Sequence, residues 1–583
     1  MKILLTALNA KFIHSSLAIR SLKAYAKKYS ESIELCEYTI NNEQEYILRD
    51  IFEKKPDAVG FSCYIWNINI IKDIAVCIKK VLPDCRIICG GPEVSYECES
   101  FLKENDFIDM VIFGEGEKPF LSLMEYFNGE RKIEDVYNLA YRKNGEIFIN
   151  PICKPAELDE IPFVYEDLTG FENKIIYYET QRGCPYNCQF CLSSVEKGVH
   201  FLSDERVLKD LQFFLDNRVK QVKFVDRTFN CNRNHAVKIW QYLMEHDNGY
   251  TNFHMEIEAH IMDDGLIEML QNAREGLFQF EIGIQSTNIN TLGAVKRNVN
   301  FEELKEVVLK IKKGGNIHVH LDLIAGLPFE GYESFKKSFN DVYSLFPQQL
   351  QLGFLKLLKG SGLRRDAEKY GIVFNPKAPY EVLYTKELNY EEMLKLKAVE
   401  NIAELYYNSG KTVNTEKFVT SLFETPFYFY ESFAEFWQRK DYHRVNHSKA
   451  QLYEIFYEFC LERKECIGKE KQIANLLKFD MLLSDNLKQL PKWAENELSD
   501  EEKRRRKAFF AEEKNIDKYI PSLKEYTAAQ LSRMCRIEKF DFDVTGFSKG
   551  DKLEKNRKNI LINYYSRDII TNNADVFDIT EDF

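Results

Sequence analysis

Two kinds of hydrophobic segment alternate over the first 150 residues. Short, nearly continuous apolar runs are separated by longer stretches in which apolar side chains recur every three or four positions. The runs predict strands at residues 2–7, 33–37, 58–62, 86–89 and 110–113, and stretches such as 16–29 and 68–81 predict helices. Because buried strands that alternate with helices indicate a parallel sheet covered on both faces, residues 1–150 are expected to form a doubly wound, Rossmann-like α/β domain.

A connection and a second alternating region follow. Residues 151–172 contain three prolines and little periodicity, which is typical of a linker. Strands are then predicted at residues 175–180, 222–226, 253–258, 278–284, 319–324 and 349–355, and helices at 203–217, 235–246, 264–272, 301–313 and 334–346. Six such β-α units predict a partial (β/α)6 barrel over residues 173–378.

The pattern changes after residue 378. Glycine and proline become sparse, and aromatic residues become dense. The periodicity predicts helices at residues 390–407, 449–465 and 501–514, with some strand after residue 537. Residues 379–583 are therefore expected to form a mainly helical C-terminal domain.

Charge and cysteine content narrow the class of protein. The 583 residues carry a net charge of −12, which argues against a nucleic acid or an anionic membrane as partner. No apolar run approaches the roughly 20 residues of a membrane span, and the first residues resemble a strand more than a signal peptide. The chain is therefore expected in the cytoplasm, where a close group of cysteines among the 14 indicates a metal site more than disulfides.

One such group lies in residues 182–191, where Cys184, Cys188 and Cys191 have the spacing C-x3-C-x2-C. Thiolates are the usual ligands of iron–sulfur clusters, and three of them can bind three irons of a [4Fe–4S] cubane. A zinc site would need a fourth ligand, usually from a second pair, whereas the next cysteine, Cys231, stands alone. The fourth iron is left either to a distant cysteine or without a protein ligand. The group follows the predicted strand 175–180, at the barrel end where active sites lie.

With Phe190 before its last cysteine, this segment resembles the signature of the radical S-adenosylmethionine (SAM) superfamily. The resemblance implies that SAM binds the open iron and that the reduced cluster cleaves it to a 5′-deoxyadenosyl radical. Residues 281–286 and 322–328 resemble the fourth and fifth strand segments of that family, and an arginine after the fourth strand could pair with the SAM carboxylate. The residues expected to contact SAM are Phe190, Asp226, Glu281, Gln285, Arg297 and Ile324. Glu281 is interpreted equally well as an ion-pair partner at a strand end.

The doubly wound domain upstream of this barrel resembles that of the cobalamin-binding subfamily, in which loops after the third, fourth and fifth strands hold the corrin. The residues that the resemblance assigns to cobalamin are Ser62, Cys63, Tyr64, Gly90, Gly91, Pro92, Glu93, Gly114 and Glu115. The cobalt-ligating pattern D-x-H-x-x-G is missing, because the only early histidine is His14. No protein histidine is therefore expected on cobalt. A docking domain that binds no corrin is the alternative.

The whole chain resembles a cobalamin-domain radical SAM protein with a C-terminal domain of unknown function. The resemblance implies a [4Fe–4S] cluster, SAM and cobalamin as cofactors, and an electron donor such as flavodoxin or ferredoxin. It also implies methylation of an unactivated carbon or phosphorus in a small molecule or peptide. A cyclisation, rearrangement or oxidation without methyl transfer is the second reading, and a non-enzymatic iron–sulfur or corrin sensor is the third.

Overall fold

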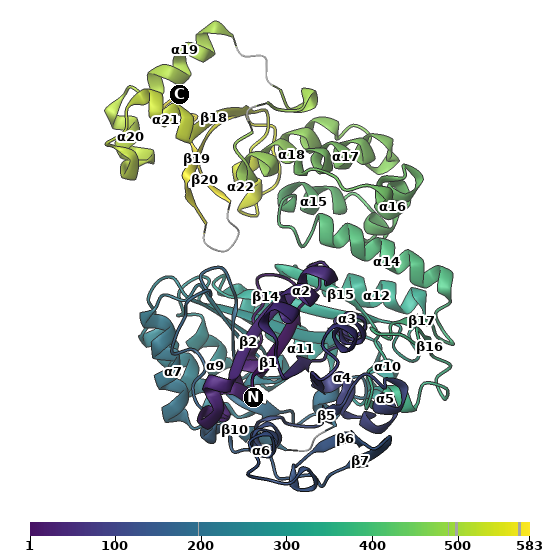
Figure 1. The fold of residues 1–583 in the computed structure, drawn as a ribbon. Helices are drawn as coiled ribbons and strands as arrows, with labels where there is room; N and C mark the ends of the chain where they lie inside the picture. The colour runs from purple at the N-terminus through teal and green to yellow at the C-terminus, as the bar shows by residue number, and fades with distance from the viewer. Residues whose placement is uncertain (196–197, 488, 496–498, 569–572) are drawn as a thin grey trace. The chain divides into compact units, whose positions relative to one another are not determined.

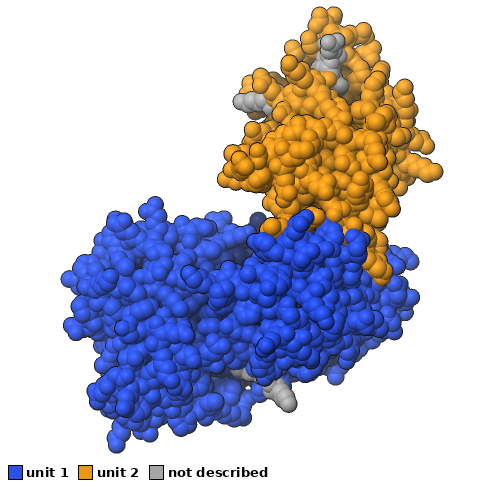
Figure 2. All heavy atoms as spheres, turned by 90° about the vertical axis from the view of Figure 1, so that its right-hand side faces the viewer, with its two compact units in different colours: residues 1–335, 353–393 blue, residues 336–352, 394–583 orange. Residues whose placement is uncertain are grey.

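The computed structural model describes residues 1–195, 198–487, 489–495, 499–568 and 573–583 (Figure 1). The chain forms two compact units, one of residues 1–335 and 353–393 and the other of residues 336–352 and 394–583 (Figure 2). The first unit contains the first predicted α/β region and most of the second, whose residues 336–352 belong to the other unit. Its last residues extend past the predicted boundary at 378, since the Leu357 N–H donates to the Tyr380 carbonyl at 3.0 Å and the Tyr380 hydroxyl donates to Glu93.

The N-terminal region forms a seven-stranded sheet with the order β2-β1-β3-β4-β5-β6-β7. Its strands are β1 (Ile3–Asn9), β2 (Ile33–Thr39), β3 (Ala58–Ser62), β4 (Arg86–Gly90), β5 (Met110–Ile112), β6 (Leu139–Lys143) and β7 (Glu146–Ile149). The first five strands are parallel to one another, β6 pairs antiparallel with β5, and β7 pairs antiparallel with β6. The predicted doubly wound fold is confirmed, and its topology sets the carboxyl ends of β3, β4 and β5 side by side.

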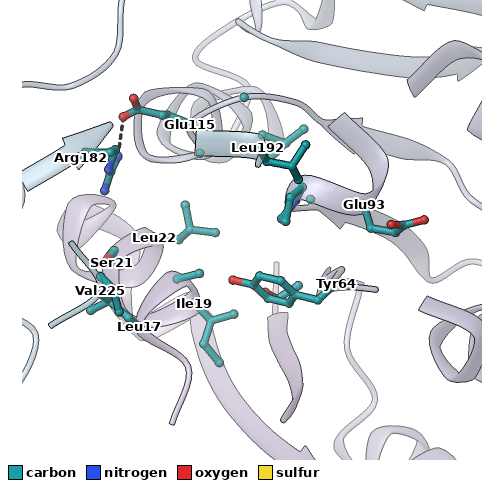
Figure 3. A pocket seen from close by; sticks show the side chains of 18 of the residues that line it. Leu17, Ile19, Ser21, Leu22, Tyr64, Glu93, Glu115, Arg182, Leu192 and Val225 are labelled. Carbon is teal, nitrogen blue, oxygen red and sulfur yellow. Dashed lines mark hydrogen bonds and ion pairs between the residues drawn. The ribbon is translucent and has the colours of Figure 1, made fainter. Parts of the chain in front are cut away.

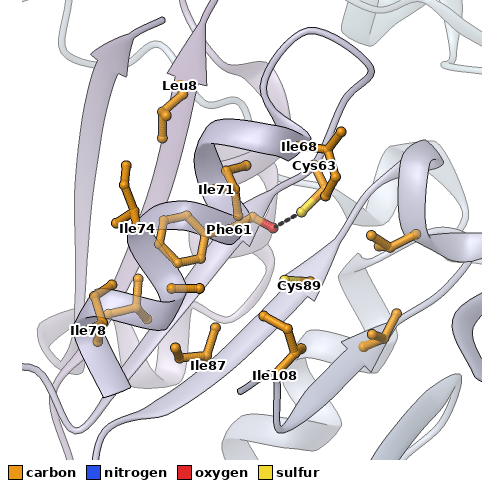
Figure 4. Close-up of a cluster of buried hydrophobic side chains, with 14 of the residues drawn as sticks. Leu8, Phe61, Cys63, Ile68, Ile71, Ile74, Ile78, Ile87, Cys89 and Ile108 are labelled. Atoms are coloured by element: carbon orange, nitrogen blue, oxygen red, sulfur yellow. Dashed lines mark hydrogen bonds between the residues drawn. The ribbon is translucent and has the colours of Figure 1, made fainter. Parts of the chain in front are cut away.

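Helices cover both faces of this sheet, because side chains along each strand alternate between the faces. Leu4 and Phe61 belong to one buried cluster, which the helices α2 (Gln44–Lys54), α3 (Ile68–Val81) and α5 (Cys98–Glu104) complete (Figure 4). Leu5 belongs to the second cluster, which α1 (Leu17–Tyr25) and α6 (Glu117–Phe127) cover. The full burial of these strands explains why they are read as continuous apolar runs.

The second α/β region forms a six-stranded sheet with the order β15-β14-β13-β12-β11-β8. Its strands are β8 (Ile176–Tyr178), β11 (Gln221–Phe224), β12 (Asn252–Glu256), β13 (Phe278–Gln285), β14 (His318–Ala325) and β15 (Gln349–Phe354). Between them run the helices α7 (Asp204–Asp216), α8 (Arg233–Glu245), α9 (Asp264–Leu270), α11 (Phe301–Lys313) and α12 (Tyr332–Tyr343). The six predicted β-α units are confirmed. A short antiparallel hairpin of β9 (Gln181–Gly183) and β10 (Val199–Phe201) is inserted after β8.

The second unit is mainly helical, as predicted. It contains α15 (Val413–Thr420), α16 (Pro426–Arg439), α17 (Lys449–Glu462) and α18 (Glu470–Ser484), whose aromatic side chains pack closely, with Phe433 and Phe459 stacked at 4.3 Å. The predicted helix 501–514 is instead two helices, α19 (Asp500–Phe509) and α20 (Glu513–Tyr519). The antiparallel sheet of β18 (Cys535–Phe540), β19 (Lys558–Arg567) and β20 (Ala574–Asp578) supplies the strand expected near the C-terminus. Among the described helices, none has the length and hydrophobicity that a bilayer crossing needs.

Candidate functional site

A tight loop between the strands of the small hairpin carries the three predicted cluster cysteines. Gly183 ends β9 with φ of 98°, and a Cβ there would lie 2.2 Å from the Gly198 carbonyl oxygen, so only glycine fits this close approach. Further along, the Cys191 N–H donates to the Cys188 carbonyl at 3.1 Å, and the Ser194 hydroxyl lies 2.8 Å from that same oxygen. The backbone thus turns on itself and holds the three thiols on one loop.

The thiols form a donor set that suits a cubane cluster. Cys188 is buried, and Cys184 and Cys191 are partly exposed. Burial raises the pKa of the Cys188 thiol, and the neighbouring thiols of Cys184 and Cys191 raise it further. The Arg297 guanidinium, 3.9 Å from the Cys188 sulfur, lowers this pKa. Because all three sulfurs lie close enough to interact and the spacing supplies no fourth, the residues fit a [4Fe–4S] cluster with one iron free of protein ligands.

Asp226, predicted to contact SAM, is fully buried beneath the start of this loop. Its carboxylate accepts hydrogen bonds from the Thr180 N–H at 2.8 Å and the Gln181 N–H at 3.1 Å, and from the Thr180 hydroxyl. Burial raises its pKa to about 7, although these hydrogen bonds oppose that shift. Asp226 therefore holds the chain that leads into the cluster loop, and its contact with SAM stays a prediction.

This buried carboxyl group makes the stability of the protein depend on pH. The folded chain retains the Asp226 proton up to about pH 7, whereas the unfolded chain releases it near the ordinary value of 3.8. The free energy of unfolding should therefore fall as pH rises between these values, by about 4 kcal/mol from this group. Asp226→Asn keeps the polar contacts without a titrating proton, so its urea midpoint should fall less than that of the wild type between about pH 5 and about pH 8. Equal changes in both proteins would assign the pH dependence to other groups.

Arg297 and Glu258 form a buried ion pair beside Cys188. Arg297 donates to Glu258 at 2.9 Å and to the Gly283 carbonyl, and the side chains are 11% and 5% exposed. The second carboxylate oxygen of Glu258 lies 3.0 Å from His260 Nδ1. A guanidinium and a carboxylate next to the cluster loop match the carboxylate and ammonium groups of an amino acid. The sequence analysis missed Glu258, although it follows β12 at the carboxyl end of the barrel.

The remaining residues predicted to contact SAM have different surroundings. Gln285 has φ of 72°, its side-chain amide oxygen is buried and makes no hydrogen bond with the described residues, and its side chain folds back over Gly283. Ile324 is half-buried near the end of β14, and Phe190 lines the cavity described next. The carboxylate of Glu281 instead contacts Lys223 at 3.1 Å within the barrel.

One cavity of about 790 Å³ joins the carboxyl edge of the N-terminal sheet to the cluster loop (Figure 3). Tyr64 and Glu93 line it from the sheet edge, and Phe190, Cys191 and Leu192 line it from the loop. The lining also includes one face of α1, made of Leu17, Ala18, Ile19, Ser21 and Leu22, which the sequence analysis did not single out. A group bound at the sheet edge therefore reaches the cluster loop through a shared space.

The structure brings most of the residues predicted for cobalamin into this cavity. The lining includes Ser62, Tyr64, Gly90, Gly91, Pro92, Glu93, Gly114 and Glu115. Gly91 has φ of 108°, and a Cβ there would lie 2.7 Å from the Cys63 carbonyl oxygen, so this turn requires glycine. Cys63 itself points its sulfur into the hydrophobic cluster on the other side, 3.6 Å from the Phe61 carbonyl (Figure 4). The glycine-bearing loops and the volume fit a large planar ligand such as a corrin.

Arg182 connects the cluster loop to the loop after β5. Its guanidinium contacts Glu117 at 3.0 Å and Glu179 at 2.8 Å, and it also contacts Glu115 (Figure 3). Burial lowers the pKa of Arg182, but Glu179 and Glu117 raise it overall. One cation is thus shared by three anions on the cavity wall.

Comparisons with known proteins agree with this geometry. The models of three families match: the B12 binding domain over residues 3–124, the radical SAM superfamily over 178–342, and a protein of unknown function (DUF4080) over 368–562. An uncharacterized methyltransferase of Pyrococcus horikoshii is 27% identical over 48% of this chain and 62% of its own length. The cobalamin-dependent radical SAM methyltransferase TokK of Streptomyces tokunonensis is 25% identical over 56% of this chain and 51% of its own. The chain thus spans about half to three fifths of these two relatives.

Two solved structures share the fold. The cobalamin-dependent SAM radical enzyme OxsB, with aqua-cobalamin bound, has a TM-score of 0.60 at 14% identity and covers 82% of this chain and 83% of its own. TsrM from Kitasatospora setae, with cobalamin and a [4Fe–4S] cluster bound, has a TM-score of 0.54 at 15% identity, over 64% of this chain and 81% of its own.

The doubly wound domain, the partial barrel and the cysteine loop define a protein of the radical SAM class. Within this class, the chain joins a region that matches the B12 binding domain to a radical SAM region and carries a C-terminal region that matches a family of unknown function. The matched families imply a [4Fe–4S] cluster, SAM and cobalamin as cofactors. The recognition made from the cysteine spacing and the glycine-bearing loops is confirmed.

Proposed function

We propose that this chain is a cobalamin-dependent radical SAM methyltransferase that acts on an unactivated carbon or phosphorus of a small molecule or peptide. The observation that carries the proposal is the single cavity of about 790 Å³ shared by the cobalamin-type sheet edge and the cluster loop. Radical formation and methyl transfer must address one atom, and reacting groups must lie within roughly 3–4 Å of each other. Two relatives whose names include methyltransferase support the same reading.

In this proposal each part of the cavity has a separate task. Cys184, Cys188 and Cys191 hold the cluster, and the pair of Arg297 and Glu258 binds the amino-acid end of SAM. The family's cofactors supply a carbon-centred radical and a methyl group when bound. Asp226 positions the loop from below. We leave Glu281 out of the SAM site because its carboxylate is already held by Lys223 and His254.

The proposal also includes an electron donor and a cellular compartment for the enzyme. The cluster needs electrons one at a time, so we include an external donor such as flavodoxin or ferredoxin. We place the chain in the cytoplasm because the 14 cysteines are all free thiols in the structure, as expected in a reducing compartment.

Anaerobic reconstitution with iron, sulfide and cobalamin tests the reaction directly. The protein is given a reductant, a host metabolite extract and SAM labelled with deuterium on its methyl group. Mass spectrometry should then find a product that carries the trideuterated methyl group. The control is the same mixture with Arg297→Ala, which should form little product because SAM loses its carboxylate partner.

A reaction without methyl transfer is the second candidate. It is favoured by a 22% identical relative, the anaerobic magnesium-protoporphyrin IX monomethyl ester cyclase of Rubrivivax gelatinosus. The same experiment separates the two, because a cyclisation, rearrangement or oxidation would consume SAM and give a product without the label. That result would overturn the methyltransferase proposal.

Bound cobalamin should carry no protein imidazole on cobalt. No histidine is among the described residues that line the cavity, and the Nδ1 atom of His14 is bonded to the Tyr177 hydroxyl at 2.6 Å. The paramagnetic cob(II)alamin form should therefore show the same electron paramagnetic resonance spectrum in unlabelled and ¹⁵N-labelled protein. A hyperfine pattern that changes with the protein label would identify a protein nitrogen on cobalt and contradict this expectation.

A further inference from the structure

A second group of ligand-type side chains lies inside the barrel and does not line the cavity. His254 on β12, Glu281 on β13 and His320 on β14 come from three neighbouring strands, and Glu281 pairs in register with His320. One ligand atom from each of these residues lies within 4.8 Å of the others. Among the described residues, no other group of three histidine, cysteine or acidic side chains brings its ligand atoms this close together.

The contacts of the group centre on one carboxylate oxygen. Oε2 of Glu281 lies 3.0 Å from His254 Nε2, 3.1 Å from Lys223 Nζ and 3.9 Å from His320 Nδ1. Two imidazole nitrogens and one carboxylate oxygen thus converge on one place, and nitrogen and oxygen donors of this kind are metal ligands.

His320 supplies an independent observation. Its side chain is 6% exposed, and Nδ1 makes no hydrogen bond within the described chain, although it faces Glu281. A buried ring nitrogen without a partner costs about 1–3 kcal/mol, and a ligand at this point would satisfy it. The other ring nitrogen, Nε2, lies 3.0 Å from Asp322 Oδ1. Histidines that bind metals commonly present their second nitrogen to a carboxylate in this way, which fixes the orientation of the ring.

The charges around the group also favour a dication. Glu256 pairs in register with Glu281, and Asp322 contacts His320, so two further acidic side chains lie beside the group. Lys223 is the cation that contacts Glu281 in the structure, and its side chain is 25% exposed. A long lysine side chain can swing towards solvent and leave the carboxylate to a second cation.

We propose that His254, Glu281 and His320 bind one divalent transition-metal ion through two imidazole nitrogens and one carboxylate oxygen. Imidazole ligands select ions such as Zn²⁺ over Mg²⁺ or Ca²⁺, and two histidines with one glutamate leave a position open for water or another ligand. The ion would cross-link three neighbouring strands. This site uses none of the cluster cysteines and does not depend on the proposed methyl transfer.

Zinc binding to the reconstituted holoprotein tests the site, because the cluster then occupies Cys184, Cys188 and Cys191. After addition of Zn²⁺ and removal of excess metal, elemental analysis should find one zinc per wild-type chain beyond the iron of the cluster. X-ray absorption should show nitrogen and oxygen ligands at roughly 2.0–2.2 Å without sulfur at about 2.3 Å. Failure of the wild type to retain zinc, or sulfur around the zinc, would overturn the proposal.

Two variants and a matched control locate the ion. His320→Asn removes a ligand whose Nδ1 has no hydrogen bond to lose, and Glu281→Gln removes the anionic ligand; each should weaken zinc binding by about 100-fold or more. The control is His318→Asn, two residues earlier on β14, where Nε2 of a half-buried histidine also makes no hydrogen bond in the described chain. It should retain zinc as the wild type does. Iron and sulfide content reports folding of the barrel in each variant, and equal zinc retention by His320→Asn and the control would contradict the assignment.

Discussion

Replacement of Cys184, Cys188 and Cys191 together by alanine is expected to abolish the iron–sulfur cluster and, with it, all reductive cleavage of SAM. Each thiol is a ligand to a different iron in the proposed cubane, so the triple variant retains no protein ligand for the cluster. After anaerobic reconstitution, the visible absorbance and the iron and sulfide content should fall to background. Production of 5′-deoxyadenosine, measured by chromatography, should fall with them.

Cys231→Ala is the matched control for this experiment. Cys231 lies close enough to Cys184 for the thiols to interact, and its sulfur donates to Gln181 at 3.4 Å. Because it stands outside the C-x3-C-x2-C spacing, its removal should leave the cluster in place. If the triple variant kept its iron and sulfide, the cysteine loop would not be the cluster site.

Arg182→Met is expected to destabilise the first unit and to weaken cobalamin binding. The change leaves Glu115, Glu117 and Glu179 without the guanidinium that they share on the cavity wall. Removal of one partner from a buried ionic group costs about 3–5 kcal/mol, because the remaining charges stay desolvated. Thermal unfolding should show the loss of stability, and the cobalamin retained after gel filtration should fall, since Glu115 lines the cavity.

Arg206→Met is the control for a general effect of losing an arginine. Arg206 contacts Asp210 at 2.9 Å, and the two side chains are 22% and 4% exposed, similar to the Arg182 group. Both residues lie on α7, away from the cavity described above. This variant should lose stability but retain cobalamin. Equal loss of cobalamin in both variants would show that Arg182 has no particular part in the corrin site.

The strands of both α/β regions were predictable because their burial leaves a direct signature in the sequence. β3 was predicted at its observed bounds, since all of its residues are buried and turn residues flank it. The sequence indicates the ends of helices less clearly than it indicates buried strands. The predicted helix 501–514 breaks after Phe509, where two phenylalanines enter the buried core of the second unit and change the direction of the chain.

The parts of the site whose residues are close together in the sequence were predictable. The parts whose residues only the fold brings together were missed. The cysteine loop follows from spacing alone, and so do the glycine turns such as Gly91. Glu258 was missed because its partner Arg297 is 39 positions away and only the barrel brings them together. Cys63 was expected at the corrin, but it shares a face with Phe61, because side chains two positions apart on a strand point the same way.

The sequence positions of the residues that line the cavity determine when the cavity can form during synthesis of the chain. Its lining begins at Leu5 on β1 and ends at Lys359, so nearly two thirds of the chain separates its first wall residue from its last. Domains fold in order as they leave the ribosome, and the N-terminal sheet can therefore form long before the rest of the wall has been made. The nascent domain would present a corrin only with the exposed edge of its sheet, without the rest of the cavity wall. The complete wall exists only after residue 359 has been made, so the full cavity depends on completion of the barrel.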